Sequence, residues 1–247
     1  MKLADTRAVV TGGASGLGAA TAAWLVQHGA QVTILDRDPR GRDFAQSIGA
    51  HFAETDVTDE ASVTRAIEAA TAAMGGITAC VNCAGIVTGE KTVGRDGPHK
   101  LDSFRRTIEI NLIGSFNVLR LAAVEMAKNA GDEKGVIINT ASVAAFDGQA
   151  GQAAYAASKA GIAGMTLPIA RDLARSGIRV MAIAPGIFGT PMLRSLPQDV
   201  QDGLAADVPF PKRLGEPEEF AQLVGNIIES GYLNGEVIRI DGALRMR

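Results

Sequence analysis

The chain has 247 residues and a mass of 25.6 kDa, a length that fits one large α/β domain better than two domains. Hydrophobic residues make up 47% of it and charged residues 21%, and this near-average composition excludes a wholly disordered chain. The formal net charge is −3, which argues against a nucleic-acid-binding protein because such proteins usually carry a basic face. We therefore expect a single domain over residues 1–247 with no nucleic-acid partner.

Short β-branched runs alternate along the chain with longer stretches of helical periodicity. The predicted strands are, in chain order, residues 7–11, 31–35, 51–53, 78–82, 135–140, 178–183 and 236–240. The predicted helices cover residues 19–28, 39–49, 58–74, 101–128, 153–175 and 216–229, and Thr58 is the expected N-cap of the third helix. This alternation predicts an α/β fold: a doubly wound, Rossmann-type parallel sheet of about seven strands with helices on both faces.

Three segments interrupt the alternation, at residues 86–100, 142–152 and 185–215. Each one follows a predicted strand, so all three are expected at the carboxyl ends of the strands, where doubly wound folds bind their ligands. Long loops at such a rim are more often functional than incidental. We therefore expect the functional site there.

Signals for export or for membrane insertion are absent from the sequence. The first five residues already turn polar, so there is no apolar core of a signal peptide. No run approaches 18 uninterrupted apolar residues, and we expect no membrane partner. These features predict a cytoplasmic protein in a reducing compartment.

The two cysteines, Cys80 and Cys83, have the C-x-x-C spacing of redox and zinc motifs. They lie in a pattern typical of a buried strand running into a loop, where positions three apart point to opposite faces, so their sulfurs are not expected to meet. A second pair of zinc ligands is missing, and the histidines at 28, 51 and 99 have no metal-type spacing. We expect neither a redox pair nor a metal site.

The turn after the first strand is rich in glycine and reads Thr11-Gly-Gly-Ala-Ser-Gly-Leu-Gly18. Its glycines allow a sharp turn and a close approach to a pyrophosphate, while the following helix offers free N–H groups. The spacing G-x-x-x-G-x-G departs from the general dinucleotide fingerprint, and a glycine-rich turn by itself is a weak signal. Its place between the first strand and the first helix nevertheless favours a nucleotide site.

Asp36 ends the second strand 18 residues after Gly18, at the position of an acid that binds the adenosine ribose. Its carboxylate can accept hydrogen bonds from both ribose hydroxyls and would repel a 2′-phosphate. Arg37 is the competing signal, because a guanidinium could pair with that phosphate. We give Asp36 the greater weight and expect NAD as the cofactor.

Tyr155 and Lys159 are four residues apart in the fifth predicted helix, which places a phenol and an ammonium on the same helix face. An ammonium close to a phenol favours the phenolate and lowers its pKa. The pair could then transfer a proton near neutral pH. As an isolated motif this spacing is common on ordinary helices.

Taken together, these motifs resemble the short-chain dehydrogenase/reductase family in order and in spacing over nearly the whole chain. The residues that carry the resemblance are the glycine turn, Asn82-Cys-Ala-Gly85, Asn111, Ser142, Tyr155-x-x-x-Lys159 and Pro185-Gly186. The resemblance implies that Tyr155 is the general acid/base and that Lys159 lowers its pKa and holds the nicotinamide ribose. It also implies that Ser142 binds the substrate oxygen and that Asn111 holds a water linking Lys159 to solvent.

The resemblance further implies the residues of the cofactor and substrate sites. For the cofactor, besides Tyr155 and Lys159, these are Gly12, Ser15, Gly16, Leu17, Gly18, Asp36, Asp56, Val57, Cys83, Ala84, Gly85, Pro185, Gly186, Phe188 and Thr190. For the substrate, they are Ser142, Gln149, Gln152 and Tyr155. Cys83 departs from the asparagine that is usual in the family, although backbone contacts to the cofactor should survive that change. Gln149 and Gln152 could equally be ordinary polar loop residues.

The implied activity is the NAD-dependent interconversion of a secondary alcohol and a ketone. Similar sequences in the C-terminal half belong to a subgroup that oxidises 3-hydroxyacyl-CoA to 3-oxoacyl-CoA, so we expect an acyl-CoA thioester as substrate. The alternatives are a 3-oxoacyl-[acyl-carrier-protein] reductase, a hydroxysteroid or other alcohol dehydrogenase, and a catalytically silent NAD-binding scaffold. The family also implies a homotetramer.

Overall fold

The computed structural model describes residues 1–95, 97–195 and 197–246. Its main sheet has seven strands in the order β3-β2-β1-β4-β7-β8-β9. Their bounds are β1 Arg7–Thr11, β2 Gln31–Asp36, β3 His51–Glu54, β4 Ala79–Asn82, β7 Gly135–Thr140, β8 Ile178–Pro185 and β9 Val237–Ile240. Every neighbouring pair is parallel. The predicted doubly wound parallel sheet is therefore confirmed.

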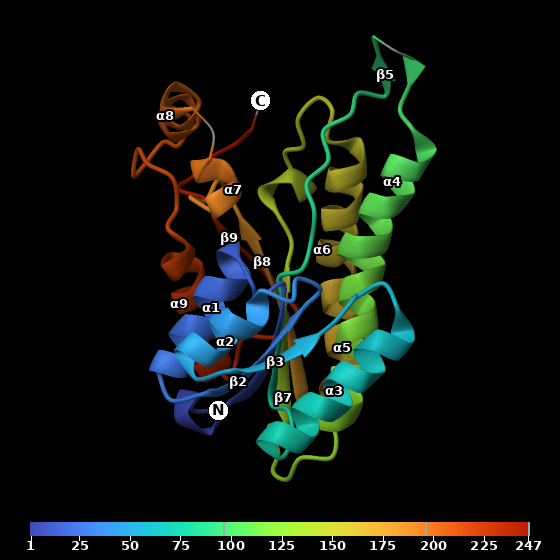
Figure 1. Cartoon of the computed structure of the whole chain (residues 1–247), viewed down its shortest axis with the longest axis vertical. Coiled ribbons are helices and arrows are strands. Elements are labelled where there is room, and N and C mark those ends of the chain that lie inside the picture. Colours follow the sequence, from blue (N-terminus) through green and yellow to red (C-terminus); the bar gives the residue numbers. More distant parts are fainter. Residues whose placement is uncertain (96, 196, 247) are drawn as a thin grey trace.

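Helices cover both faces of this sheet (Figure 1). Their bounds are α1 Gly16–Gln27, α2 Gly41–Ile48, α3 Glu60–Met74, α4 Leu101–Ile108, α5 Gly114–Met126, α6 Ala153–Leu173 and α9 Pro217–Glu229. One core cluster joins the strands to α1, α2 and α9, and the other joins them to α3, α5 and α6. The sheet is thus the middle layer of three.

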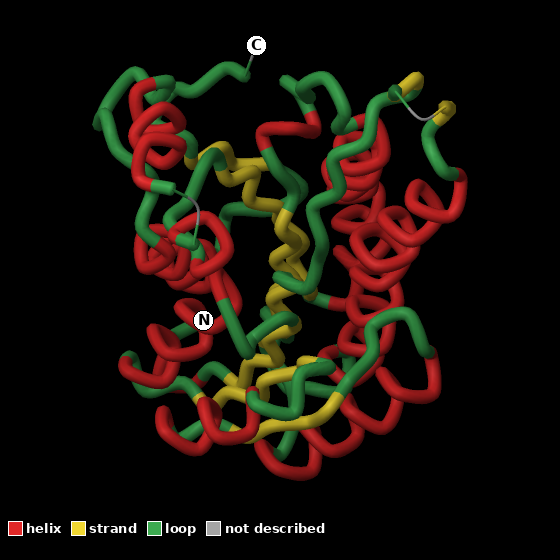
Figure 2. Tube along the Cα trace, turned by 45° about the horizontal axis from the view of Figure 1, so that its top comes forward, coloured by secondary structure: helices red, strands yellow, loops and turns green. Residues whose placement is uncertain are grey.

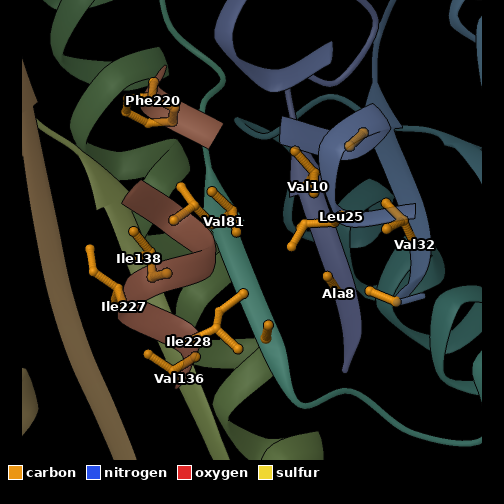
Figure 3. Packing of buried hydrophobic residues seen from close by; sticks show 14 of the residues in the cluster. Ala8, Val10, Leu25, Val32, Val81, Val136, Ile138, Phe220, Ile227 and Ile228 are labelled. Carbon is orange, nitrogen blue, oxygen red and sulfur yellow. The ribbon is translucent and has the colours of Figure 1, made fainter. Parts of the chain in front are cut away.

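Alternation along each strand divides the buried residues between the two layers. Val10 belongs to the same core cluster as Leu25 of α1 and Phe220 of α9 (Figure 3), whereas Val9 belongs to the cluster that contains Ile67 of α3 and Val118 of α5. Neighbouring side chains on a strand point to opposite faces. Because both faces are covered, the strands are continuous hydrophobic runs, which is why the sequence pattern located them well.

The helix boundaries differ from the predicted ones in two informative places. The third helix is capped by Asp59, whose carboxylate accepts hydrogen bonds from the backbone N–H groups of Ala61 and Ser62, so the assignment of Thr58 as N-cap is wrong. The long helix predicted over residues 101–128 consists of α4, a π-helical turn at Glu109–Ile113 and α5. Such π-helical turns are often found at functional sites.

The three interrupting segments contain short elements that the periodicity did not indicate. They are the hairpin of β5 Val93–Gly94 with β6 Gly97–Pro98, the 3₁₀ turn Val143–Ala145, α7 Pro191–Arg194 and α8 Gln198–Ala206. Two further 3₁₀ turns, Leu3–Asp5 and Ala174–Ser176, lie elsewhere. Figure 2 shows these loops gathered at one end of the sheet beside the C-terminus. The strands, turns and helices within these loops are too short to produce a recognisable helical or strand period in the sequence.

The continuous helical stretch Leu101–Met126 is the one described segment that is long and apolar enough to cross a membrane by length and composition alone. Half of its most apolar window is buried, and α5 packs with α3 and the sheet. Central helices of α/β domains commonly have this composition, so the feature is weak support for a membrane span.

We predict that Gly225→Ala destabilises the fold. A Cβ at Gly225 of α9 would collide with the ring of Trp24 on α1, and such overpacking costs about 1–3 kcal/mol. In the control Gly203→Ala, on α8, the Cβ meets nothing within 4 Å. Thermal unfolding should show a lower midpoint for Gly225→Ala than for the natural protein, and no lowering of the midpoint for Gly203→Ala. An unchanged midpoint for Gly225→Ala would mean that the α1–α9 contact is loose.

Candidate active site

A cavity of about 1200 Å³ lies at the carboxyl ends of the strands. Pockets for one small ligand usually measure about 300–1,000 Å³, so this one has room for a cofactor and a substrate together. Every predicted cofactor residue lines it, as do Ser142, Gln149 and Gln152. Asn111 is the one predicted site residue that does not.

The glycine turn after β1 forms the floor of the cavity. A Cβ on Gly12 would lie 2.8 Å from the backbone of Ala84, and a Cβ on Gly18 would collide with the carbonyl oxygen of Gly12. Only glycine fits at these two positions. Gly16 begins α1, so backbone N–H groups without helical partners are available at this point, as an anionic pyrophosphate requires.

The carboxylate of Asp36 is fixed where β2 ends, in the wall of the cavity. Its Oδ2 accepts from the backbone N–H of Ala14 at 3.0 Å and its Oδ1 from that of Asp38 at 2.9 Å. A carboxylate has about four acceptor sites, so these bonds orient it and leave capacity for ribose hydroxyls. Arg37 lines the same wall.

A short polar network fixes the ends of the three central strands. The hydroxyl of Thr11 accepts from the backbone N–H groups of Cys83 and Ala84 at 3.1 and 3.0 Å. The Asn82 amide donates to Asn139 Oδ1 at 2.9 Å. Because buried polar groups need partners, these bonds define where β1, β4 and β7 stop and the cavity begins.

Lys159 is almost fully buried, with 5% of its surface exposed. Its ammonium donates a hydrogen bond to the carbonyl oxygen of Thr140 at 2.7 Å and lies 5.8 Å from the centre of the Tyr155 ring. Burial lowers the pKa of Lys159 from 10.5 to about 8, against a smaller opposing effect of Cys83. This side chain therefore titrates close to physiological pH.

Tyr155 lies one helical turn before Lys159 on α6, as the spacing predicted. Burial raises the pKa of its phenol, and a hydrogen bond with Ser142 acts in the opposite direction without outweighing it. The net shift is upward because desolvation dominates, and the lowering of the Tyr155 pKa by Lys159 that the family resemblance implies stays a prediction. The phenol is a protonated donor at neutral pH.

Ser142 follows β7 and is oriented by the backbone. Its Oγ accepts from the N–H of Ala144 at 3.1 Å and so caps the 3₁₀ turn Val143–Ala145. The hydroxyl stays in the cavity wall beside Tyr155. Ser142, Tyr155 and Lys159 thus converge from two different elements.

The two cysteines lie on opposite faces of the sheet, as predicted. Cys80 belongs to the core under α3 and α5, whereas Cys83 packs against the core under α1 and lines the cavity. Burial raises the pKa of the two thiols to about 12 and about 11 respectively. Both are free and protonated at neutral pH, which makes them poor nucleophiles.

Asn111 lies behind the cavity, in the π-helical turn between α4 and α5. Its amide accepts from the backbone N–H of Ile86 at 2.8 Å and donates to Ile86 O at 2.9 Å and to Ser158 Oγ at 3.0 Å. These contacts hold the segment after β4 against α6. The water that the family resemblance assigns to Asn111 stays a prediction.

Several lining residues gave no sequence signal. Leu193, Leu204 and Met246 form an apolar part of the wall, and Arg105 and Arg106 of α4 line its edge. The carbonyl of Thr140 could not be assigned a role either, because any residue supplies a carbonyl. Among the described residues, no group of three or more His, Cys, Asp or Glu side chains is placed to hold a metal ion.

Comparison with known proteins agrees with this geometry. A family model described as short chain dehydrogenase matches residues 6–201. The chain is 56% identical to the 3-hydroxyacyl-CoA dehydrogenase type-2 of Homo sapiens, over 97% of this chain and 95% of that protein. It is 53% identical to the protein of the same name from Drosophila melanogaster, over 96% of each.

A solved structure is similar over nearly the whole length. The crystal structure of 3-hydroxyacyl-CoA dehydrogenase type-2 from Mycobacterium avium superposes with a TM-score of 0.94 at 43% identity, covering 98% of this chain and 96% of the other. The fold therefore agrees with the sequence similarity. The chain belongs to the short-chain dehydrogenase/reductase family, and this membership implies a nicotinamide cofactor.

Proposed function

We propose that this oxidoreductase interconverts 3-hydroxyacyl-CoA and 3-oxoacyl-CoA with NAD as cofactor. The observation that carries the proposal is the convergence of Ser142, Tyr155 and Lys159 in one cavity that also contains Asp36. The names of the relatives that align over nearly the whole chain support the acyl-CoA substrate. A catalytically silent scaffold has no need for such a set.

The glycine turn and Asp36 suit the pyrophosphate and the adenosine ribose of a dinucleotide. The glycine turn and the start of α1 fit the pyrophosphate, and Asp36 favours the unphosphorylated ribose of NAD because its negative charge would repel a 2′-phosphate. When bound, the nicotinamide supplies the carbon that accepts or gives the hydride. The protein's task is to place the substrate and to handle its proton.

Tyr155 is the group that handles this proton. Its protonated phenol can donate to the oxygen of a ketone during reduction, and in the oxidation of an alcohol its phenolate oxygen accepts the proton that the hydroxyl loses. Ser142 would hold that substrate oxygen next to the phenol. The positive charge of Lys159 favours the phenolate once water is excluded, because opposite charges interact more strongly in a dry site.

The rest of the cavity accommodates the acyl part of the substrate. Leu193 and Leu204 come from the segment that contains α7 and α8, and Met246 comes from the C-terminal tail. These apolar side chains would lie against the acyl chain, while Gln149 and Gln152 would face the thioester. The cavity volume leaves room for this second ligand.

We also propose a homotetramer, as the family implies. Its support here is a set of large apolar side chains that α5, the turn before it and α6 leave exposed: Ile113, Phe116, Val124 and Leu167. Such residues are typical of an interface when they gather on neighbouring helices. The cytoplasmic location stays a prediction from the sequence.

We expect Tyr155→Phe to abolish most turnover while the cofactor still binds. Loss of a general acid/base costs roughly 10²- to 10⁴-fold in rate, and the change removes only the hydroxyl. Steady-state rates with acetoacetyl-CoA and NADH, together with NADH fluorescence titration, measure the two effects. The control is Tyr232→Phe, at the other tyrosine of the chain, which is fully exposed. Near-normal turnover by Tyr155→Phe would contradict the assigned role.

The cofactor and substrate are tested by one panel. With 3-hydroxybutyryl-CoA we expect at least about tenfold higher kcat/KM for NAD than for NADP, a ratio that corresponds to about 1.4 kcal/mol, because the Asp36 carboxylate would repel the 2′-phosphate of NADP. Asp36→Ser should reduce this preference, whereas Asp43→Ser, on the exposed side of α2, should not. A preference for NADP, or faster turnover of acyl-carrier-protein thioesters, would favour the 3-oxoacyl-[acyl-carrier-protein] reductase instead.

Lys159→Met should stabilise the fold in a pH-dependent way. The unfolded chain holds the Lys159 proton up to about pH 10.5 and the folded chain only to about pH 8, so the charged form costs folding roughly 3 kcal/mol below pH 8. This cost is relieved as the pH rises from 8 to 10.5. Urea unfolding at several pH values should show an advantage of Lys159→Met that shrinks over that interval.

The matched control is Lys128→Met, at an exposed lysine paired with Glu125. Its difference from the natural protein should stay nearly constant with pH, because an exposed pair contributes little. A pH-independent difference for Lys159→Met as well would mean that the ammonium is not desolvated in the folded protein.

A further inference from the structure

The guanidinium of Arg239, on the edge strand β9, contacts three residues in two parts of the chain, the 142–152 loop and the C-terminal tail. Its Nε donates to Asp241 Oδ2 at 2.7 Å. One terminal nitrogen, Nη2, donates to Asp147 Oδ2 at 2.6 Å and to the carbonyl oxygen of Leu244 at 3.0 Å. None of these residues takes part in the proposed reaction, but each one lies next to, or within a few residues of, a residue that lines the cavity.

The contact with Asp147 fixes the 142–152 loop, which contains the predicted substrate-binding residues. Asp147 lies between Ser142 and Gln149, and its backbone N–H donates to the carbonyl of Val143 at 2.9 Å. The ring of Phe146 adds a second contact, since the Arg239 guanidinium carbon lies 5.5 Å from its centre. Arg239 therefore holds this loop through Phe146 and Asp147, which do not line the cavity.

The contacts with Asp241 and Leu244 fix the C-terminal tail. Asp241 packs so closely on the Pro185-Gly186 turn that a Cβ on Gly186 would lie 2.9 Å from Asp241 Cα. Leu244 is buried, and Met246, two residues further on, lines the cavity. The same guanidinium thus sets the position of the tail relative to the loop.

The charges of this cluster are shielded enough for the contacts to matter. The exposed side-chain fractions are 23% for Arg239, 19% for Asp147 and 8% for Asp241. Burial works against the charged form of Arg239, but its hydrogen bonds to Asp147 and Asp241 outweigh this and raise its pKa. Charge-assisted bonds in partly buried positions are stronger than surface ion pairs.

We infer that Arg239 is a positioning residue that sets the spacing between the 142–152 loop and the C-terminal tail, and with it the shape of the substrate side of the cavity. A planar guanidinium can serve several acceptors at once, which a lysine ammonium cannot do with the same geometry. The inference rests on the proposed function in one respect: the 142–152 loop has to face the substrate.

The test compares Arg239→Met with Arg245→Met. Arg245 pairs with the same Asp241 at 3.2 Å and makes no contact with Asp147, so its variant removes an equal charge from the same cluster without releasing the loop. For Arg239→Met we expect KM for 3-hydroxybutyryl-CoA to rise about tenfold and kcat to fall, as losing a charge-assisted bond implies. The dissociation constant of NADH should change less than KM, because the glycine turn and Asp36 lie outside the Arg239 contacts and only the Pro185-Gly186 turn packs on one of its partners, Asp241.

Amide hydrogen exchange gives a readout that needs no substrate. The N–H groups of Phe146 and Asp147 both donate to Val143 O and should exchange faster in Arg239→Met than in Arg245→Met. If the natural protein does not turn over acyl-CoA, the proposed function fails and this measurement still decides the inference. Equal exchange in the two variants, or an unchanged KM and kcat for Arg239→Met, would overturn it.

Two further variants keep the test decisive if Arg239→Met folds poorly. Asp147→Asn removes only the charge of the loop partner and should reproduce the rise in KM, and combining it with Arg239→Met should add little, because both changes break one contact. Arg239→Lys should restore part of the activity through a single ion pair. Effects of Asp147→Asn and Arg239→Met that multiply would show that the two residues act independently, against the inference.

Discussion

A positive charge held inside the protein is the constraint on which the rest of the site depends. Lys159 has to place its ammonium beside Tyr155, yet an isolated buried charge costs several kcal/mol. The structure meets this cost with the carbonyl of Thr140, the last residue of β7, at 2.7 Å. That carbonyl is available because the strand ends there. This hydrogen bond ties α6 to the end of β7 in addition to the hydrophobic packing between them.

The same reasoning applies to the ends of the strands on the cofactor side. Chains that leave a sheet expose backbone groups that need partners, and Thr11 supplies one for the N–H groups of Cys83 and Ala84. With that bond the segment after β4 lies so close to the glycine turn that Gly12 admits no side chain. Close approach of two backbones, rather than any particular side chain, thus forms the floor on which a dinucleotide can lie.

The features that the sequence predicted are local ones, and those that it missed depend on tertiary contacts. The glycine turn, Asp36 and the Tyr155–Lys159 spacing are local signals, because each depends on residues within one turn or one strand end. The strands were also predictable, since burial on both faces gives continuous apolar runs. The N-cap of the third helix is Asp59 instead of Thr58, because the side chain of Thr58 donates a hydrogen bond to Asp56. The hydrophobic periodicity of the sequence does not distinguish between these two residues.

Other features required the folded chain. The pKa of Tyr155 depends on the balance between its burial and its hydrogen bond with Ser142, whereas the helical spacing identifies only Lys159 as a neighbour. Arg239 and Met246 lie about 90 residues or more from the loop and the tyrosine that they flank. A single sequence shows no link between them. Residues that act across such separations are recognised only when the tertiary contacts are known.

The two halves of the cavity are consequently built in different ways. The cofactor half is formed by the glycine turn, the backbone next to it and the carboxylate of Asp36, which two backbone N–H groups hold in place. These features tolerate little change. The substrate half is formed by the side chains of a loop, two short helices and a tail, joined through Arg239. Substitutions there can alter the pocket without touching the glycine turn or Asp36, because Arg239 bonds to Asp147, Asp241 and Leu244 and to neither of these. A fold of this kind can keep one hydride chemistry while its substrate changes, and the side-chain contacts around the loop and tail are where such a change would occur.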